Sequence, residues 1–339
     1  MASDILKDKN ALVTGCYGFV ASWIIAQLLD RGVRVVGLTE DVEPESALVL
    51  NGLADKICIV RGSITDPLLM ERVFTQYEIQ FCFHLAAQTV ERTCTASPLV
   101  TFETNTRGTW NVLEAARRSK FTESVVVASS DKAYGEQEIP YRETQPLLGR
   151  APYDVAKACA DLIAQAYFHT FQLPVAVLRC ANIYGGGDFH WSRIVPGTIR
   201  SVFEGERPVI RSDGSPLRDY MYAADAANAY ITLAEAVCEK PEVRGEGFNF
   251  GMEKPISALD LVKTIIGLSD KPDLEPEVLG KGRMEAEIDR QYLCCDKARN
   301  LLDWQGGYVI EAGLRETIAW YNNYLRQSRA ERAAPSGSG

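Results

Sequence analysis

Short β-branched runs alternate with longer helical patterns through the first 180 residues of the chain. The first apolar run, at residues 11–14, predicts a strand, and the apolar residues that follow at helical spacing predict a helix ending at Arg31 and Gly32. Further strands are expected at 33–38, 57–60, 80–85, 124–129 and 175–182, and long helices at 98–119 and 153–171. This alternation is typical of βαβ units, so we predict an α/β fold with a doubly wound parallel sheet.

The rhythm changes after Gly185, where proline, glycine and charged residues become denser and the expected elements become shorter. We therefore expect the sheet domain to span residues 1–182 and a smaller, substrate-facing α/β region to occupy 183–327 in the main. The chain is expected to return to the sheet around 219–250. Residues 328–339 end in Pro-Ser-Gly-Ser-Gly and are typical of a disordered tail.

The composition is that of a globular protein. Of 339 residues, 46% are hydrophobic and 24% are charged, which suits one large or two linked domains. The net charge of −9 argues against a grip on nucleic-acid phosphates or anionic lipid surfaces. No apolar stretch is long enough to span a membrane, and residues 1–10 do not fit a signal peptide, so a cytoplasmic protein is expected.

Cysteines and histidines do not suggest a metal centre. The nine cysteines are scattered without a CxxC pair, and the three histidines are not spaced as ligands. In a cytoplasmic protein such cysteines are reduced thiols that pack as small hydrophobic residues. His84 ends a buried strand, and we expect it to be packed or hydrogen-bonded in the core rather than to act as a base.

A glycine-rich loop connects the first strand to the first helix. Gly15 and Gly18 let the turn close and bring backbone N–H groups to a pyrophosphate at the helix N-terminus, while Ala21 still permits close packing of the helix on the sheet. This loop predicts dinucleotide binding in a Rossmann domain. The second strand ends at Thr39, followed by Glu40 and Asp41, and no basic residue comes next to receive a 2′-phosphate. The expected cofactor is therefore NAD.

A second motif, Tyr153 to Lys157, places a phenol and an ammonium one turn apart on the same face of a helix. A nearby cation, together with the positive nicotinamide, is expected to lower the phenol pKa so that Tyr153 acts as a base. Ser129 and Ser130 end the preceding strand. Together with the glycine loop, these residues indicate a redox site.

With these motifs the chain, from about residue 10 to 324, resembles the extended short-chain dehydrogenase/reductase family and specifically its nucleotide-sugar epimerases and dehydratases. The resembling segments are 84–88, 104–109, 129–135, 153–157, 179–185 and 218–220. In that family the sheet binds NAD and the C-terminal part binds a nucleoside-diphosphate sugar. The resemblance implies catalytic roles for Ser130, Tyr153 and Lys157.

The resemblance also implies binding residues. Those implied for the cofactor are Gly15, Tyr17, Gly18, Phe19, Val20, Thr39, Ser63, Ile64, Leu85, Ala86, Ala87, Gln88, Tyr153 and Lys157. Those implied for the nucleotide sugar are Gln88, Asn182, Arg193, Arg218 and Arg290. Two positions depart from the family pattern, since Ser63 and Thr39 stand where acidic residues are usual.

The turn after Ser130 separates two activities. A 4-epimerase exchanges hydride at C4 alone, whereas a 4,6-dehydratase also needs a base at C5 and an acid at C6. Asp131 and Lys132 occupy the turn, and the pair is similar to that of CDP-glucose 4,6-dehydratases. The resemblance implies Asp131 as the acid and Lys132 as the base, which requires burial and the nicotinamide to lower the lysine pKa against the effect of Asp131.

Other interpretations stay open at this point. Asp131 and Lys132 are also compatible with a surface salt bridge, and residues 133–135 resemble the epimerase ending, which keeps a 4-epimerase as the alternative. A catalytically silent dinucleotide-binding scaffold is a third possibility, although such proteins usually lose one of the residues Ser130, Tyr153 and Lys157. The helix at 110–117 resembles the stretch through which such enzymes form homodimers.

Overall fold

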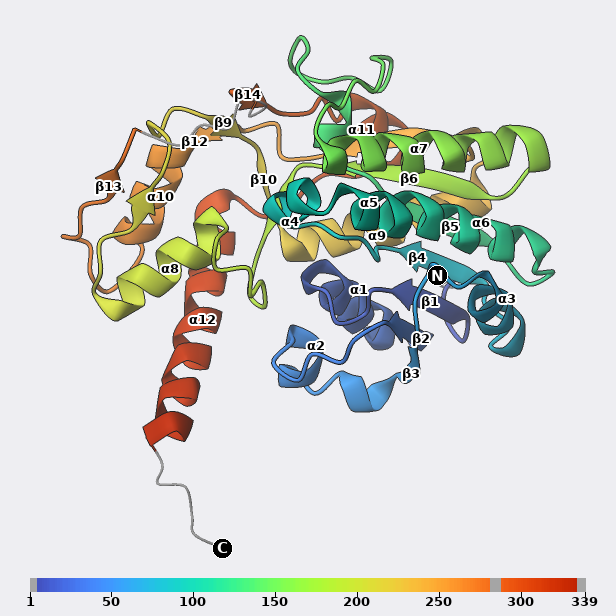
Figure 1. Ribbon diagram of the computed structural model, residues 1–339, viewed down its shortest axis with the longest axis horizontal. Coiled ribbons are helices and arrows are strands. Elements are labelled where there is room, and N and C mark those ends of the chain that lie inside the picture. The colour runs from blue at the N-terminus through green and yellow to red at the C-terminus, as the bar shows by residue number, and fades with distance from the viewer. Residues whose placement is uncertain (1–4, 281–287, 334–339) are drawn as a thin grey trace, which may run out of the picture.

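The computed structural model describes residues 5–280 and 288–333 and contains a seven-stranded parallel sheet (Figure 1). The strand order is β11-β6-β5-β4-β1-β2-β3. The strands are β1 (Asn10–Thr14), β2 (Arg34–Thr39), β3 (Cys58–Arg61), β4 (Phe81–His84), β5 (Ser124–Ala128), β6 (Val175–Cys180) and β11 (Gly247–Phe250). This Rossmann-like order places a topological switch point between β1 and β4, where dinucleotides bind in such sheets.

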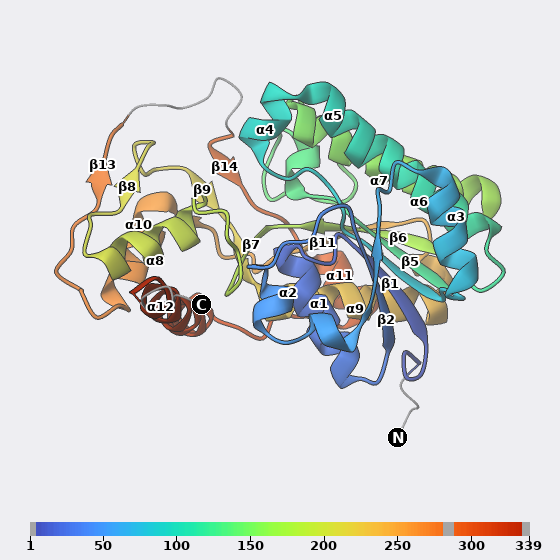
Figure 2. The same ribbon diagram turned by 60° about the horizontal axis from the view of Figure 1, so that its bottom comes forward.

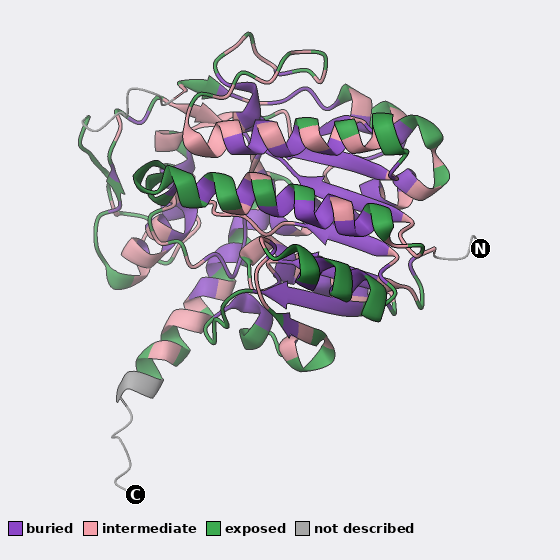
Figure 3. Cartoon of the chain, turned by 45° about the vertical axis from the view of Figure 1, so that its right-hand side comes forward, coloured by how far each residue is buried: buried purple, intermediate pink, exposed green. Residues whose placement is uncertain are grey.

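The middle strands are mostly hydrophobic because both faces of the sheet are covered by helices, and their polar exceptions are His84, Ser124 and Arg179. Every residue of β4, β5 and β6 is buried (Figure 3). Successive side chains in β1 point to opposite cores, with Ala11 and Val13 in one and Leu12 in the other. Such predominantly apolar strands are typical of burial on both faces.

Two sets of helices form the outer layers. One face of the sheet carries α1 (Phe19–Asp30) and α9 (Ala223–Glu239), which pack on each other. The other face carries α3 (Pro67–Gln76), α6 (Gly108–Arg118) and α7 (Pro152–Phe171) (Figure 1). The sequence prediction of a Rossmann-type α/β fold is confirmed.

A smaller lobe lies beyond the carboxyl ends of the strands (Figures 1 and 2). Its helices are α8 (Ile194–Glu204), α10 (Ala258–Gly267) and α12 (Ile310–Ala333). Three small sheets accompany these helices. Two are two-stranded, β7 (Asn182–Tyr184) with β10 (Tyr220–Tyr222) and β8 (Val209–Ile210) with β13 (Glu277–Val278), and one is three-stranded, β9 (Leu217–Arg218) with β12 (Ile256–Ser257) and β14 (Arg290–Gln291). The core of this lobe is rich in tyrosine, including Tyr184, Tyr222 and Tyr321.

The helix expected at 98–119 is interrupted. It consists of α5 (Pro98–Phe102), a π-helical turn η2 (Glu103–Arg107) and α6, preceded by α4 (Glu91–Ala96). The π turn directs Asn105 inward, where its side chain hydrogen-bonds both the N–H and the C=O of Gln88 at 2.7 and 2.9 Å. A polar side chain thereby satisfies a loop that leaves the sheet, which is a common use of such turns.

Two further boundaries differ from the expectation. The sixth strand ends at Cys180, and residues from Asn182 onward form the separate strand β7 because they pair with β10 instead of β11. Helix α12 continues to Ala333, so the tail expected from residue 328 is wrong for 328–333, and residues 334–339 lie outside the described part.

The other elements are α2 (Ala47–Leu50), η1 (Ala54–Lys56), η3 (Asp131–Tyr134), η4 (Pro241–Val243) and α11 (Asp296–Leu302). Within the described residues, no helix is both long and apolar enough to cross a membrane.

Candidate active site

The glycine loop closes against the loop that follows β4. Gly15 has φ +70°, and a Cβ at this position would lie 3.0 Å from the Ala86 Cα, so glycine is needed for both the backbone conformation and the close approach. Gly18 is the N-cap of α1 and brings no side-chain cap, and the first turn of α1 holds no acidic residue. The uncapped N–H groups and the helix dipole therefore fit a pyrophosphate.

A buried chain of hydrogen bonds fixes the loop at residues 85–88. The Thr14 hydroxyl accepts the N–H groups of Leu85 and Ala86 at 3.1 and 3.0 Å, so its own hydrogen points to His84 Nδ1 at 2.9 Å. The ring proton then lies on Nε2, which is 3.0 Å from Thr109 Oγ1. Burial, reinforced by the charge of Lys157, lowers the His84 pKa to about 3. His84 is thus a neutral core residue, as expected.

The remaining residues predicted to bind the cofactor lie near the glycine loop and differ in burial and in hydrogen-bond partners. Thr39 ends β2, is buried, and donates its hydroxyl to the carbonyl of Asp41. Ser63 Oγ lies 2.9 Å from Thr65 Oγ1 in the turn after β3, and Ile64 is buried with its carbonyl bound to Asn111 at 3.0 Å. Tyr17, Phe19 and Val20 lie at the start of α1, and Ala87 lies within the loop after β4. These positions line one edge of the sheet, while the Thr39 and Ser63 side chains bond to their own loops.

Ser130, Tyr153 and Lys157 come together where β5 ends and α7 begins. Ser130 lies close enough to Tyr153 to lower the pKa of its phenol, and Lys157 Nζ lies 6.0 Å from the centre of the Tyr153 ring. The Lys157 ammonium donates to the carbonyl of Ala128 at 2.7 Å, and burial lowers its pKa to about 8. The phenol and hydroxyl thus lie side by side, as in a site that removes a proton from an alcohol.

The pKa of Tyr153 differs from the sequence expectation. Burial, with the negative charges of Asp131 and Glu91, raises the phenol pKa, and Arg193 and Ser130 lower it only in part. The protein's own charges do not produce the expected lowering of this pKa, because burial outweighs the effect of Arg193, and Lys157 donates to the Ala128 carbonyl. A lowered pKa would need a positive charge from outside the chain.

Asp131 begins the turn η3 and is nearly inaccessible, with 2% of its surface exposed. Ser130 Oγ donates to Asp131 Oδ1 at 3.0 Å. Burial raises the Asp131 pKa, against the opposing effect of Lys132 and Ser130. A carboxyl with a raised pKa holds its proton more readily than an exposed one, which suits a general acid.

Lys132 pairs with a residue that the sequence reasoning did not consider. Its Nζ lies 3.0 Å from Glu91 Oε1, at the start of α4. Burial lowers the Lys132 pKa, but Glu91 and Asp131 outweigh it and the pKa is raised. The expectation of a partly neutral Lys132 is therefore wrong, because a carboxylate from a different loop holds the ammonium. The interpretation of Asp131 and Lys132 as a surface salt bridge is also wrong, since Asp131 is buried and Lys132 bonds to Glu91.

Two of the predicted substrate residues face this same group. Arg193 bonds Asp188 at 2.9 Å, and its charge lowers the pKa values of Tyr153 and Glu91. Arg218 bonds the carbonyls of Leu217, Ile288 and Asp289, and its charge lowers the pKa of Asp131. Both arginines therefore lie within electrostatic reach of the turn at Ser130.

The other three predicted substrate residues are less closely connected with the turn. Asn182 begins β7, and its N–H donates to the carbonyl of Asp219 at 3.1 Å. Arg290 is exposed on β14, in register with Leu217. The Gln88 side chain accepts the N–H of Val90 at 3.1 Å.

Sequence reasoning missed Glu91 and Asp154. Asp154 follows Tyr153 directly, and burial raises its pKa to about 6 despite the charge of Lys132 and a bond to the Ala151 backbone. The position of Asp154 inside the Tyr-Lys motif offered a signal. Glu91 had none, because its partner Lys132 is remote in sequence and only the fold brings them together.

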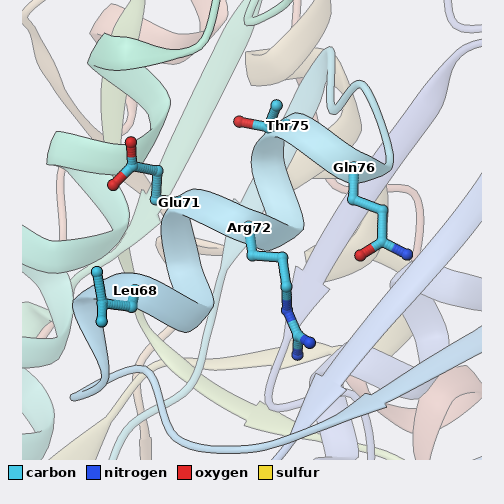
Figure 4. A pocket seen from close by; sticks show the side chains of 5 residues that line it. All are labelled: Leu68, Glu71, Arg72, Thr75 and Gln76. Atoms are coloured by element: carbon cyan, nitrogen blue, oxygen red, sulfur yellow. The ribbon is translucent and has the colours of Figure 1, made fainter.

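A surface depression away from these residues has no comparable chemistry (Figure 4). It is lined by Leu68, Glu71, Arg72, Thr75 and Gln76, all on α3. A single helix face without converging buried polar groups does not form a binding site of the usual kind.

Comparison with known proteins identifies the family of the chain. Residues 11–251 match the NAD dependent epimerase/dehydratase family. CDP-glucose 4,6-dehydratase of Salmonella typhimurium is 28% identical over 94% of this chain and 92% of that protein, and dTDP-glucose 4,6-dehydratase of Neisseria gonorrhoeae is 31% identical over 95% and 98%.

Solved structures agree. UDP-glucose 4-epimerase of Thermotoga maritima, solved with UDP-glucose, superposes with a TM-score of 0.84 at 26% identity, covering 93% of this chain and 99% of that one. dTDP-glucose 4,6-dehydratase of Bacillus anthracis in complex with NAD gives a TM-score of 0.79 at 28% identity, covering 94% and 98%. The chain therefore belongs to the NAD-dependent epimerase/dehydratase family, and NAD is its cofactor.

Proposed function

We propose that this protein is a nucleoside-diphosphate-sugar 4,6-dehydratase acting on a CDP-glucose-like substrate. The observation that carries the proposal is the buried carboxyl of Asp131, hydrogen-bonded to Ser130 beside Tyr153. Hydride exchange at C4 needs the phenol and hydroxyl alone, whereas loss of water also needs an acid at C6. The similarity to CDP-glucose and dTDP-glucose 4,6-dehydratases points the same way.

Tyr153 and Ser130 would act on the C4 hydroxyl. NAD, when bound, would supply the acceptor for the C4 hydride and the source of the hydride that the sugar later regains. Tyr153, as phenolate, accepts the hydroxyl proton, and Ser130 orients the oxygen through its hydroxyl. Lys157, 6.0 Å from the phenol ring and bonded to the Ala128 carbonyl, keeps the end of β5 and the start of α7 in register.

Ser130 links the two proton-transfer groups. Its hydroxyl donates to Asp131 at 3.0 Å and lies close enough to Tyr153 to lower the pKa of the phenol. The proton that Tyr153 takes from the C4 hydroxyl can therefore pass through Ser130 to Asp131, which gives a proton to the departing C6 hydroxyl. This path makes the two steps balance without a proton from solvent.

The phosphates of the substrate would be held by arginines. Arg193 and Arg218 lie within electrostatic reach of the turn, and guanidinium groups bind phosphate oxygens in a fork. Asn182 and Arg290 lie on neighbouring short strands that border the smaller lobe. The nucleotide-sugar class follows from this placement together with the relatives' substrates.

The test is a panel of CDP-, dTDP-, UDP- and GDP-hexoses analysed by mass. We expect a product lighter by one water from one of them, with catalytic amounts of NAD and no steady accumulation of NADH. Stoichiometric NADH would indicate a simple dehydrogenase instead, and no reaction with any sugar would favour the silent scaffold.

A 4-epimerase is the second candidate. It is favoured by the Ala133-Tyr134-Gly135 ending and by the high structural similarity to a UDP-glucose 4-epimerase. In the same panel an epimerase would give a product of unchanged mass, inverted at C4.

We also propose a homodimer formed through the helices on one face of the sheet. Large apolar side chains are exposed there, with Leu99 73%, Trp110 43% and Leu162 55% accessible on α5, α6 and α7. These helices contact one another, so a second copy could cover them together. Light scattering should give twice the chain mass, and Trp110→Lys should shift it toward the monomer.

A further inference from the structure

We infer that Glu91 is a further catalytic residue and accepts the proton from C5 of the sugar, with Lys132 as its positioning partner. This inference rests on the proposed dehydratase function. It replaces the assignment of Lys132 as the base, which the family resemblance suggested from position alone.

Glu91 lies beside the turn that carries Asp131 and Lys132, and we call this charged group the mouth of the site. Glu91 begins α4, just after the loop that leaves β4, while Lys132 lies in the turn that leaves β5, the neighbouring strand. Glu91 Oε1 and Lys132 Nζ are 3.0 Å apart, and 48% of the Glu91 side chain remains exposed. The carboxylate is thus fixed by one contact and still open to a ligand.

A base must be unprotonated when substrate arrives, and Lys132 does not meet this condition. Its ammonium contacts Glu91 and follows Asp131 directly in the chain, so two carboxylates favour its charged form. Glu91, in contrast, is surrounded by positive charge. Lys132, Arg218 and Arg193 lower its pKa, which keeps it ionised at neutral pH.

The two other carboxyl groups nearby have different surroundings. Asp131 is buried, accepts the Ser130 hydroxyl and has a raised pKa, which suits a proton donor. Asp154 bonds the backbone of Ala151 at the start of α7. Glu91 is the carboxylate of this group that is both ionised and exposed.

The elimination then balances within the site. Glu91 takes the proton from C5 of the 4-keto sugar, and the electron pair of the C5–H bond forms the C5–C6 double bond as the C6–O bond breaks. The leaving hydroxyl takes the proton of Asp131 and departs as water. The half-exposed Glu91 carboxyl exchanges its proton with water before the double bond is reduced, so the proton that it then gives to C5 comes from solvent and the original C5 label is released.

The experiment uses nucleotide-glucose carrying deuterium at C5, with the nucleotide that the panel identifies. Two quantities are measured on the full-length protein with NAD: release of the C5 label to solvent, and single-turnover C4 oxidation from the NADH absorbance. We expect Glu91→Gln to slow label release by about 100-fold or more, as is usual for a lost general base, while C4 oxidation persists. Glu91→Asp keeps a carboxylate, so its rate of label release should be about one tenth of the parent rate or higher.

Matched variants separate the outcomes. Glu103→Gln, which neutralises an exposed glutamate paired with Arg107 at 2.9 Å, should leave both quantities unchanged. If Lys132 is the base, Glu91→Gln should keep or accelerate label release, because the freed lysine loses its proton more readily. Lys132→Met should then abolish label release. Together these two results would overturn the inference. Equal losses of oxidation and label release in Glu91→Gln would also overturn it, since they indicate a binding defect. Failure of the proposed function is distinct, because the parent enzyme itself would then retain the C5 label.

Discussion

Two regions of the site bind and react through different parts of the chain. The cofactor crevice is formed by the glycine loop at Gly15 and the loop at 85–88, and the mouth of the site is formed by Glu91, Asp131 and Lys132. At the crevice the backbone supplies the chemistry: Gly15 permits the close approach to Ala86, and the uncapped start of α1 presents N–H groups. At the mouth, charged side chains from separate elements meet, and each sets the protonation of the next. A backbone site is defined by local geometry, whereas a side-chain site is defined by its neighbours.

Replacement of Tyr153 by phenylalanine tests the mouth most severely. The ring and its packing remain, but the proton acceptor is lost, so single-turnover C4 oxidation should slow by about 10²–10⁴-fold. Stopped-flow absorbance of NADH measures this, and circular dichroism checks the fold. A near-normal rate on the true substrate would place the base elsewhere and remove the main reason for treating the mouth as a side-chain site.

A buried ion pair contacts the end of the turn that carries Asp131 and Lys132. Arg179 on β6 and Asp161 on α7 are 2.7 Å apart and almost fully buried, and Arg179 also donates to the Tyr134 hydroxyl at the end of the Ser130 turn. Asp161→Ala leaves the guanidinium uncompensated and should lower the free energy of unfolding by about 3–5 kcal/mol. Urea denaturation measures the change. Glu103→Ala at an exposed pair is the control and should cost less than about 1 kcal/mol.

These contrasts also explain what the sequence could predict. The glycine loop, the parallel strands and the Tyr153–Lys157 spacing are local patterns, and each corresponds to an element of the structure. Strand β5 ends at Ala128, one residue before the predicted boundary, and Ser130 and Asp131 follow it at the start of η3. The protonation of Lys132 was not predicted correctly, because it depends on Glu91, which is 41 residues earlier in the chain and carries no motif. The π turn at Glu103–Arg107 was not predicted, and the contact that Asn105 makes with Gln88 from within it is not evident from the local sequence.

The pH dependence of folding stability tests His84, which lies beside the cofactor crevice. His84 is buried and neutral with a pKa of about 3, below the usual 6.5, so the unfolded chain binds more protons than the folded one between these values. Stability from this residue is therefore present above pH 6.5 and decreases as the pH falls toward 3, by about 2–3 kcal/mol near pH 4.5. Urea midpoints from pH 7 to 4.5 should fall more steeply in the parent than in His84→Gln. Parallel slopes would show that His84 does not couple the crevice to pH.

The smallest expected effect concerns the glycine loop itself. Alanine at Gly15 meets a positive φ and the Ala86 backbone at 3.0 Å, whereas alanine at Gly18 meets only the Gly15 carbonyl at 3.0 Å with an ordinary φ of −65°. A strain of about 1–2 kcal/mol at Gly15 should weaken NAD binding by about tenfold, and Gly18→Ala should weaken it less. Isothermal titration of NAD measures both.

A third glycine separates backbone strain from loss of the crevice. Gly52 also has a positive φ, of +63°, but a Cβ there would meet no atom within 4 Å. Gly52→Ala should therefore cost some folding stability and leave the NAD dissociation constant unchanged. If Gly52→Ala weakens NAD binding as much as Gly15→Ala, the effect comes from general destabilisation, and the crevice is not defined by the local backbone geometry at Gly15. If Gly15→Ala alone weakens binding, the contact with Ala86 sets the affinity, and the contrast with the side-chain mouth holds.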